Sequence, residues 1–362
     1  MIEVRTVKHL DEMGQLLELF RICCRQDRSE EHWRWEYMEN PLASADPDVI
    51  VALDGRRIVG ARPFWLAELW VGNERVRAAQ HCDTMVHPDY RSKGIFGQMG
   101  EFGVRYLREN GFALSYGFPG PMARAGFLKQ GYRIVAQTEN MFRPVRPERL
   151  LSYRLRNRVL SGGLGLLYSA LFPSGLKNTP LPRGPFEVRT CDRFSDELRE
   201  IDSLRDRSAI EVVRSESYLR WRFDQHPDNE YRYLVATKEG ELWGYAVISV
   251  QAEANGLVYG IIVDYLVKDK DAGCFRALAG ACLNELAESE FDMMLVWAFS
   301  EPAFRAELMK EFGLRPSTGF PYSRFFAYDY FEALLTDERL AERTDIYDRA
   351  NWRVTHALHD VR

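Results

Sequence analysis

The sequence repeats itself at a nearly constant distance, and this duplication limits the fold more than any other feature. Residues 32–37 (HWRWEY) recur as residues 218–223 (YLRWRF), and a proline stands four residues after each copy. Trp35 and Trp221 are therefore 186 residues apart. Further pairs follow in the same order, 179–184 residues apart: Gly60 and Gly244, Asp83 and Asp264, Val86 and Val267, Gly94 and Gly273, Pro121 and Pro302, and Gly131 and Gly313. Such an ordered set predicts two halves with one fold.

Each half shows the same order of predicted elements after a helical opening. Apolar runs predict strands, and runs with the helical period predict helices. In the first half we expect strands at 48–53, 58–70 and 76–86, a helix at 94–109, a strand at 112–118, a short helix at 121–130 and a last strand at 132–142. In the second half we expect strands at 231–237, 242–250 and 257–267, a helix at 272–289, a strand at 292–298, a short helix at 301–312 and a last strand at 321–328. Strands that alternate with helices predict an α/β (α+β) fold, with a mixed sheet covered by helices in each half.

Composition narrows the class of protein. A chain of 362 residues that is 46% hydrophobic and 13% aromatic can build two packed domains. A net charge of −5 gives no general reason to expect nucleic acid as a partner. The six cysteines show no metal-ligand spacing, so we interpret them as reduced thiols and expect a cytoplasmic protein without a metal. The N-terminus lacks an apolar signal core, and no window is apolar enough for a membrane span.

Residues 86–97 (VHPDYRSKGIFG) are the segment with the clearest chemical meaning. They follow a predicted strand and open a predicted helix. The first N–H groups of a helix have no partner within it, and the helix dipole adds partial positive charge there. Gly94 and Gly97 allow close approach of a ligand, and Arg91 and Lys93 add positive charge. The segment therefore predicts a site for a pyrophosphate, which coenzyme A carries.

This run resembles motif A of the GCN5-related N-acetyltransferase (GNAT) superfamily, whose pattern is Val-x-x-x-x-Arg/Gln-x-x-Gly-x-Gly/Ala. Val86, Arg91 and Gly94 match, Pro88 stands where a proline is common, and Phe96 replaces the last Gly/Ala. The order of elements in both halves is also the GNAT order. The resemblance implies tandem GNAT-like domains, each with a mixed, mostly antiparallel twisted sheet flanked by helices.

The resemblance also implies a co-substrate, acetyl-CoA or another acyl-CoA, and the residues that contact it. The positions carried over are Thr84, Met85 and Val86 for the acyl and pantetheine groups, Arg91, Ser92, Lys93, Gly94, Ile95, Phe96 and Gly97 for the pyrophosphate, and Pro121, Met122 and Ala123 for the pantetheine arm. It further implies that an amine attacks the thioester directly.

The catalytic acid and base do not follow the family pattern. The usual acid is a Tyr four residues before a Gly-Phe/Tyr pair, and here that position is Phe127, which leaves Tyr116 as the nearest tyrosine. The usual acidic residue six before the motif valine is Gln80. His81 and Asp83 are two apart on a predicted strand and would share a face, so they are candidates to bind or deprotonate an amine. Glu36, in the helical opening near the expected acceptor site, is a weaker candidate, because its aromatic neighbours are typical of a core. Core packing is the alternative interpretation of Tyr116. The match of Asp83 with Asp264 in the second half favours a structural role for both aspartates.

The second half has lost the anion site. Its counterpart of the motif, residues 267–275 (VKDKDAGCF), is two residues shorter and carries Asp269 and Asp271 around Lys270. Carboxylates at a phosphate site cost Coulomb energy. We therefore expect coenzyme A in the first half only, with the second half completing the acceptor site or stiffening the first.

These features divide the chain into four parts. We expect an acyl-CoA-binding GNAT domain at 1–143, a linker at 144–185, a degenerate GNAT-like domain at 186–330 and a C-terminal extension at 331–362. Residues 150–172 are read as a linker helix packed across both domains, with a membrane-surface helix as the alternative. The run 351–362 reads as an edge strand of the second domain, although in some tandem GNAT proteins the terminal carboxylate enters the active site.

Together these observations predict an acyl-CoA-dependent N-acyltransferase of a small-molecule amine. A non-catalytic acyl-CoA-binding sensor or scaffold is the alternative, favoured by Phe127 and Gln80. A third reading, a Fem-like aminoacyl transferase, ranks last because such proteins generally lack the phosphate motif seen at residues 91–97.

Overall fold

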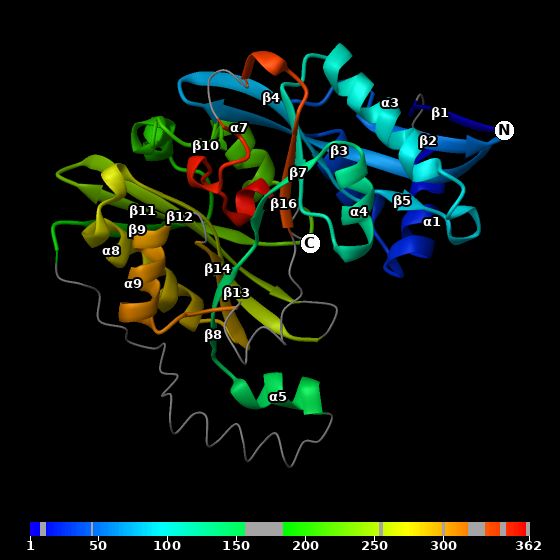
Figure 1. The fold of residues 1–362 in the computed structure, drawn as a ribbon. Helices are drawn as coiled ribbons and strands as arrows, with labels where there is room; N and C mark the ends of the chain where they lie inside the picture. The colour runs from blue at the N-terminus through cyan, green and yellow to red at the C-terminus, as the bar shows by residue number, and fades with distance from the viewer. Residues whose placement is uncertain are drawn as a thin grey trace.

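The protein is described here by a computed structural model that covers residues 1–7, 12–44, 46–155, 184–252, 256–298, 301–317, 330–340 and 345–359. Two sheets lie next to each other, and each is flanked by helices (Figure 1). This arrangement confirms the predicted α+β fold with two GNAT-like halves. The segments predicted as a strand at 321–328 and as most of a helix at 150–172 lie outside the described residues, apart from the start of the latter.

The first sheet has the strand order β1-β2-β3-β4-β6-β16-β7, with β5 and β10 paired to β3. Parallel pairing joins β4 to β6, and the other strand pairs of this sheet are antiparallel. The strands are β1 (Ile2–Thr6), β2 (Val49–Asp54), β3 (Arg57–Val71), β4 (Glu74–His81), β5 (Met85–Val86), β6 (Leu114–Gly117), β7 (Arg133–Gln137), β10 (Ile210–Val212) and β16 (Tyr330–Leu335).

The second sheet has the order β15-β8-β14-β13-β12-β11-β9. Its parallel pair joins β13 to β14, which corresponds to β4 and β6 in the first sheet. The strands are β8 (Asn140–Pro144), β9 (Glu187–Cys191), β11 (Tyr231–Lys238), β12 (Glu241–Ala252), β13 (Val258–Val267), β14 (Met293–Trp297) and β15 (Arg315–Pro316).

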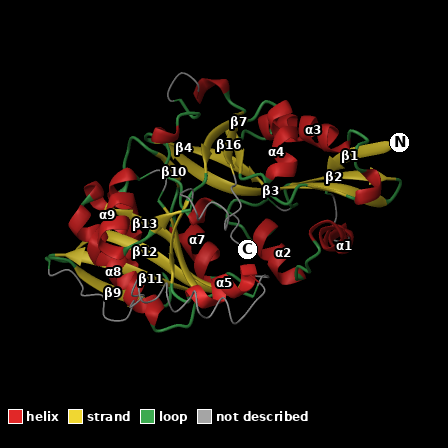
Figure 2. Ribbon diagram, turned by 60° about the horizontal axis from the view of Figure 1, so that its bottom comes forward, coloured by secondary structure: helices red, strands yellow, loops and turns green. Residues whose placement is uncertain are grey.

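Helices cover the first sheet on both faces, as Figure 2 shows. On one face lie α1 (Met13–Cys24) and α2 (Glu30–Tyr37), and on the other lie α3 (Ile95–Glu109) and α4 (Pro121–Lys129). The alternation of strand side chains explains this, because Val49 and Val51 pack in the cluster with α1 and α2, whereas Ile50 and Ala52 pack in the cluster with α3. The second half carries the short α7 (Glu216–Leu219), α8 (Ala272–Ala287) and α9 (Pro302–Phe312), and α5 (Pro147–Leu155) begins the connection between the halves.

The two halves exchange a strand. The single strand predicted at 132–142 is instead two: β7 stays in the first sheet, whereas β8 crosses into the second sheet and lies between β14 and β15. In return, β16 from the C-terminal half lies between β6 and β7 of the first sheet (Figure 1). Residue 143, expected at the end of the first domain, therefore lies in a strand of the second sheet. Each sheet is completed by the other half.

The repeated tryptophans lie where the two halves meet. Trp35 on α2 and Trp221, in the π-helical turn after α7, stack with ring centroids 5.1 Å apart and an interplanar angle of 20°. The indole N–H of Trp35 donates to the carbonyl of Trp221, and the indole N–H of Trp221 donates to the carbonyl of Trp35. Reciprocal contacts of equivalent residues are the mark of a two-fold interface, so the halves pack as a pseudo-dimer within one chain.

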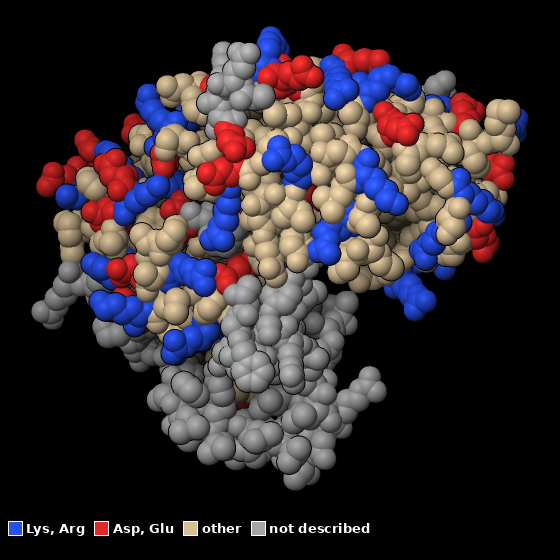
Figure 3. Space-filling view, in the orientation of Figure 1, with Lys and Arg blue, Asp and Glu red and all other residues tan. Residues whose placement is uncertain are grey.

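The C-terminal segment is buried between the halves rather than forming the expected edge strand. Trp352 makes an isolated bridge with Ile210, between two short 3₁₀ turns at Arg349–Asn351 and His356–Leu358. The hydroxyl of Tyr218 donates to the carbonyl of Ala357 at 2.6 Å. In the described ranges, no helix is long and apolar enough to cross a membrane. Figure 3 shows acidic and basic side chains interspersed over the described part of the visible face.

Candidate functional site

The strand before the motif loop breaks where the family places the thioester. β4 pairs with β6 over Ala78–Gln80 and ends at His81, and the chain then resumes as β5, which pairs with β3 alone. Asp83, in the break, has a φ of 41°, a left-handed conformation that a non-glycine residue rarely adopts. From this point the β4–β5 strand no longer pairs with β6. Thr84, Met85 and Val86 therefore lie beyond the point where the two parallel strands separate.

The motif loop leads into a helix start without a side-chain cap. Gly94 is the N-cap of α3 with φ 79°, and no side chain caps its N–H groups. In the described part of the chain, the backbone N–H groups of 92–97 donate no hydrogen bond to another segment. Arg91 and Lys93 are exposed beside them, and a Cβ on Gly97 would meet nothing within 4 Å. These are the properties of an open anion site.

The departure from the motif at Phe96 has a structural reason. The Phe96 ring packs against Phe127 of α4, with centroids 5.2 Å apart. A Cβ on Gly126 would come within 2.4 Å of the Phe96 ring, so Gly126 provides the room for it. The phenyl ring thus packs under α4, and the Ile95 side chain is buried in the core.

The start of α4 is the third predicted contact with coenzyme A. Pro121 occupies the first turn, Met122 is 94% exposed and Ala123 is half-buried. Gly120, the N-cap, contributes no side-chain hydrogen bond. A large apolar side chain left this exposed fits the prediction that this turn flanks an extended ligand, which remains a prediction.

His81 and Asp83 do not face each other. His81 is buried on the α4 face, where its ring stacks on Phe127 at 3.9 Å and lies 3.4 Å from Glu332 of β16. Burial, with a smaller effect of Arg62, lowers the pKa of His81 well below its usual value, and burial raises the pKa of Glu332 to about 8. Asp83 instead contacts the α1–α2 side. The positive φ at Asp83 breaks the strand alternation on which the predicted pair depended.

Asp83 is held by an arginine and a tyrosine. The Arg28 guanidinium and the Tyr37 hydroxyl both donate to Oδ2 of Asp83. Arg28 is followed 186 residues later by Arg214, at the same separation as the two tryptophans. Arg214 in turn binds both carboxylate oxygens of Asp264.

The second-half aspartate repeats this environment closely. Arg214 approaches Asp264 at 2.8 and 2.9 Å, and the Tyr245 and Thr355 hydroxyls also donate to it. Both aspartates therefore receive an arginine and a tyrosine. This repetition supports the structural reading of Asp83.

Tyr116 is fully buried on the face opposite His81. It lies on β6, with the rings of Phe118 and Phe331 at 6.5 and 6.3 Å. Phe127, at the family's tyrosine position, is buried between His81 and Tyr132. The Tyr132 hydroxyl contacts Ser115 and Arg62. In the structure, neither Tyr116 nor Tyr132 is exposed to solvent.

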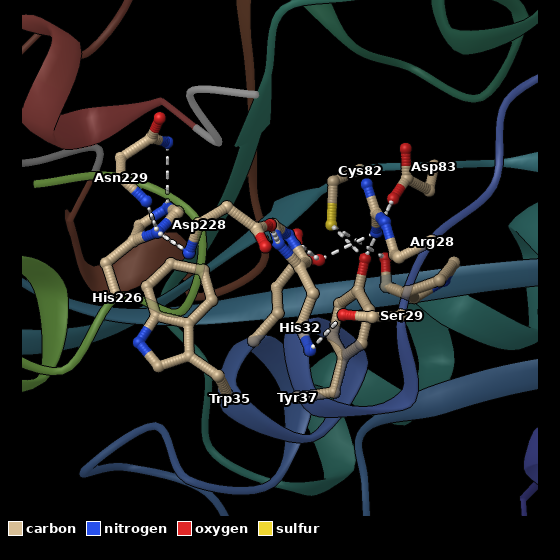
Figure 4. Close-up of polar contacts among 12 residues, drawn as sticks. Arg28, Ser29, His32, Trp35, Tyr37, Cys82, Asp83, His226, Asp228 and Asn229 are labelled. Atoms are coloured by element: carbon tan, nitrogen blue, oxygen red, sulfur yellow. Dashed lines mark hydrogen bonds and ion pairs between the residues drawn. The ribbon is translucent and has the colours of Figure 1, made fainter. Parts of the chain in front are cut away.

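A chain of polar contacts links the strand break to the second half (Figure 4). The sequence singled out Asp83 and Glu36 but not their connection through His32 to Asp228. Arg28 Nη1 donates to Glu36 Oε2 at 2.7 Å as well as to Asp83. Glu36 Oε2 lies 3.6 Å from His32 Nε2, and His32 Nδ1 contacts Asp228 of the second half. Its members lie up to 200 residues apart in the sequence, although the Arg28–Arg214 repeat could have marked its centre.

Comparison with known proteins identifies a family for the first half of the chain. Residues 3–135 match a family described as an acetyltransferase (GNAT) domain. Residues 3–135 therefore form a GNAT domain. Comparison with curated proteins found no significant sequence match.

Solved structures resemble the whole chain rather than the first half alone. A GCN5-related N-acetyltransferase from Anabaena variabilis ATCC 29413 matches with a TM-score of 0.63 and 10% identity, over 93% of this chain and 73% of that chain. A probable N-acyltransferase of unknown function from Enterococcus faecalis V583 matches with a TM-score of 0.61 and 14% identity, over 93% and 73%. A tandem GNAT protein from the clavulanic acid biosynthesis pathway matches with a TM-score of 0.57 and 14% identity, over 93% and 99%. At these identities the likeness shows the fold, which is that of tandem GNAT proteins.

Proposed function

We propose that this protein transfers an acyl group, in the simplest case acetyl, from coenzyme A to the amine of a small molecule. The observation that carries the proposal is the start of α3. Its N–H groups at 92–97 make no other hydrogen bond in the described chain, its N-cap is Gly94, and Arg91 and Lys93 stand beside it. A pyrophosphate supplies the anionic acceptors that such a helix start lacks.

In this proposal the reaction takes place where the two parallel strands separate. With the pyrophosphate at α3, the pantetheine arm would run past Val86 and Pro121 toward the separation of β4–β5 from β6. Backbone groups of 84–86 would hold the thioester carbonyl there, and the amine would attack from the α1–α2 side. Orientation and carbonyl polarisation then supply most of the acceleration. A thiolate, whose thiol has a pKa of about 8.5, needs little help to leave.

Two features favour a second candidate function, a non-catalytic acyl-CoA sensor. Phe127 brings no hydroxyl to the position of the family's acid, and Tyr116 is fully buried. A sensor would bind acyl-CoA without transferring the acyl group. A Fem-like aminoacyl transferase remains the third candidate, disfavoured by the intact motif loop. A cytoplasmic location, with reduced cysteines, is part of the proposal.

Turnover measured with a matched pair of variants tests the proposal. Acetyl-CoA is mixed with a panel of primary amines, amino acids and amino sugars, and release of the coenzyme A thiol is followed. In Gly97→Glu, a carboxylate enters open space in the first turn of α3, where acidic residues suit a helix, so the fold should persist. Repulsion of about 1.4–4 kcal/mol at the pyrophosphate should weaken coenzyme A binding roughly 10- to 1000-fold.

The control is Ala272→Glu, which places the same charge in the first turn of α8. It should leave turnover unchanged. Tight coenzyme A binding by the wild-type protein with no transfer to any amine would favour the sensor. Equal activity of Gly97→Glu and the wild type would contradict the proposed site.

A further inference from the structure

The polar chain between the two halves consists of a buried carboxylate, an imidazole and an exposed carboxylate, in that order. Figure 4 labels the imidazole of His32 and the exposed Asp228. The Glu36 side chain is 4% exposed, the His32 side chain 12% and the Asp228 side chain 56%. Glu36 Oε2 lies 3.6 Å from His32 Nε2, just beyond hydrogen-bond length, and His32 Nδ1 contacts Asp228 Oδ2 directly. An imidazole that is approached on both ring nitrogens can accept a proton on one and release it from the other.

The buried end of this chain reaches the reaction site. One nitrogen of Arg28 donates to both Glu36 and Asp83, so the two carboxylates lie within two hydrogen-bond lengths of each other. Asp83 is in the strand break where the thioester is expected. Oε2 of Glu36 makes the contacts to Arg28 and His32, and no hydrogen bond within the described ranges uses Oε1. Glu36 can therefore accept a further donor on the side of the break.

Local structure holds each member in place. Ser29 caps α2 by accepting from the backbone N–H of His32, which puts His32 in the first turn and Glu36 one turn later on the same face. In the second half, His226 accepts from the backbone N–H groups of Asp228 and Asn229 at 3.1 Å each. His226 thus fixes the loop that presents Asp228 to α2.

We propose that Glu36 takes the proton of the attacking amine, and that His32 and Asp228 carry this proton across the boundary between the halves to solvent. This inference rests on the proposed acyltransferase function. It gives the second half a chemical task, although that half lacks an anion site of its own.

The step balances without any further reactant. The amine nitrogen attacks the thioester carbon, the new C–N bond forms, and the C–S bond breaks to release the coenzyme A thiolate. The extra proton on nitrogen passes to Glu36, then to His32 Nε2, while the proton on Nδ1 passes to Asp228 and on to water. The thiolate takes a proton from water, so the products are an amide and a free thiol.

The charges around His32 set the pH range of the relay. Burial alone would lower the pKa of His32, and Arg28 and His226 also face it, but Glu36 and Asp228 outweigh these effects and the pKa is raised. Burial lowers the pKa of His226, which stays neutral at physiological pH. His32 can accept a proton only above its own pKa, so the relay should fail as the pH falls through that value.

Rates measured between pH 5.5 and 9 with acetyl-CoA and an active amine from the panel test the relay. His32→Gln should lower kcat about 100-fold above the pKa of His32, and the difference from wild type should shrink below it. Added imidazole should restore activity to His32→Ala and should leave the activity of the wild type unchanged. Asp228→Asn should move the acidic limb of the profile to lower pH, because it removes a carboxylate that raises the pKa of His32.

Glu30→Gln is the matched control, since Glu30 pairs with Arg34 on the exposed side of the same helix. It should leave the rate and the profile unchanged. A His32→Gln enzyme with the wild-type rate and profile would overturn the relay, and so would a uniform loss at all pH values that imidazole does not restore. A wild-type protein that binds coenzyme A but acylates no amine would overturn the proposed function, and the relay with it.

Discussion

The two halves begin their central helices in opposite ways. Helix α3 starts at Gly94, with no side-chain cap and with exposed cations beside it. Helix α8 starts at Asp271, whose carboxylate accepts from the backbone N–H of Cys274 at 2.8 Å. A carboxylate thus occupies in the second half the position that a phosphate would take in the first. On our proposal, two similar folds differ in ligand binding because their central helices begin differently.

The strand separations differ as well. In the first half, β5 continues beyond the break without pairing to β6. In the second half, Tyr265 of β13 donates to the carbonyl of Trp297 on β14 across the corresponding region. Thr355 of the C-terminal segment donates to Asp264 there, and Trp297 stacks on His356 at 4.2 Å. The second half fills with its own residues the space that the first half would offer to a ligand.

The largest difference between the halves is expected in the free energy of unfolding, when Asp83 and Asp264 are each replaced by asparagine. Asp264→Asn leaves the fully buried Arg214 without its main counter-charge and should cost about 3–5 kcal/mol of unfolding free energy. Asp83→Asn should cost less, about 1–3 kcal/mol. Asp264 binds Arg214 through both carboxylate oxygens, whereas Arg28 and Tyr37 both donate to Oδ2 of Asp83. Denaturant unfolding measures both. Acyl transfer by Asp83→Asn should fall less than about 100-fold, the low end of what a general base contributes.

A larger catalytic loss in a folded Asp83→Asn protein would make Asp83 the base. Equal stability losses for the two variants would contradict the difference between the halves.

The exchanged strands give a second, smaller contrast. Glu139, just before β8, pairs with Arg305 at 2.5 Å, whereas Glu332 on β16 faces the neutral His81. Because the pKa of Glu332 is raised to about 8, the folded state binds its proton more tightly than the unfolded state does. Its stabilising effect is therefore present at acidic pH and is lost as the pH rises toward 8.

Glu332→Gln should remove this loss. Relative to wild type, the free energy of unfolding of the variant should rise by roughly 1–3 kcal/mol between pH 5 and pH 8. Glu139→Gln should instead be destabilised because it breaks an ion pair. Thermal unfolding at the two pH values measures both, and a pH-independent difference for Glu332→Gln would refute the buried-acid account.

The smallest effects are expected at the aromatic positions. If transfer needs no tyrosine acid, Tyr116→Phe should change turnover little, and Phe127→Tyr should leave it unchanged or raise it. Steady-state rates with acetyl-CoA measure both variants. A 100-fold loss in Tyr116→Phe with intact coenzyme A binding would make Tyr116 the acid.

The sequence predicted the helices and strands of each half better than it predicted which strands pair with each other. The duplication, the strand–helix order and the motif loop are local or periodic signals, and the structure confirms the fold that they indicate. The exchange of β8 and β16 left no such signal, because a strand has the same pattern in either sheet. The direction of Asp83 was likewise hidden, since a positive φ at a non-glycine residue cannot be read from alternation.

The polar chain across the halves was missed for a related reason. His32 and Asp228 are 196 residues apart, and although His32 opens the repeated segment 32–37, the repeat does not indicate its contact with Asp228. Only the equal spacing of Arg28 with Arg214 and of Trp35 with Trp221 connected this region to the duplication. Contacts between halves depend on how they pack, which the pattern within each half does not specify.

Calorimetric titration with coenzyme A tests the central claim, that only the first half keeps the anion site. The account predicts one site per chain in the wild-type protein, loss of at least about 90% of the affinity in Gly97→Glu, and unchanged binding in Ala272→Glu. Two sites per chain, or binding that survives Gly97→Glu and is lost in Ala272→Glu, would contradict it.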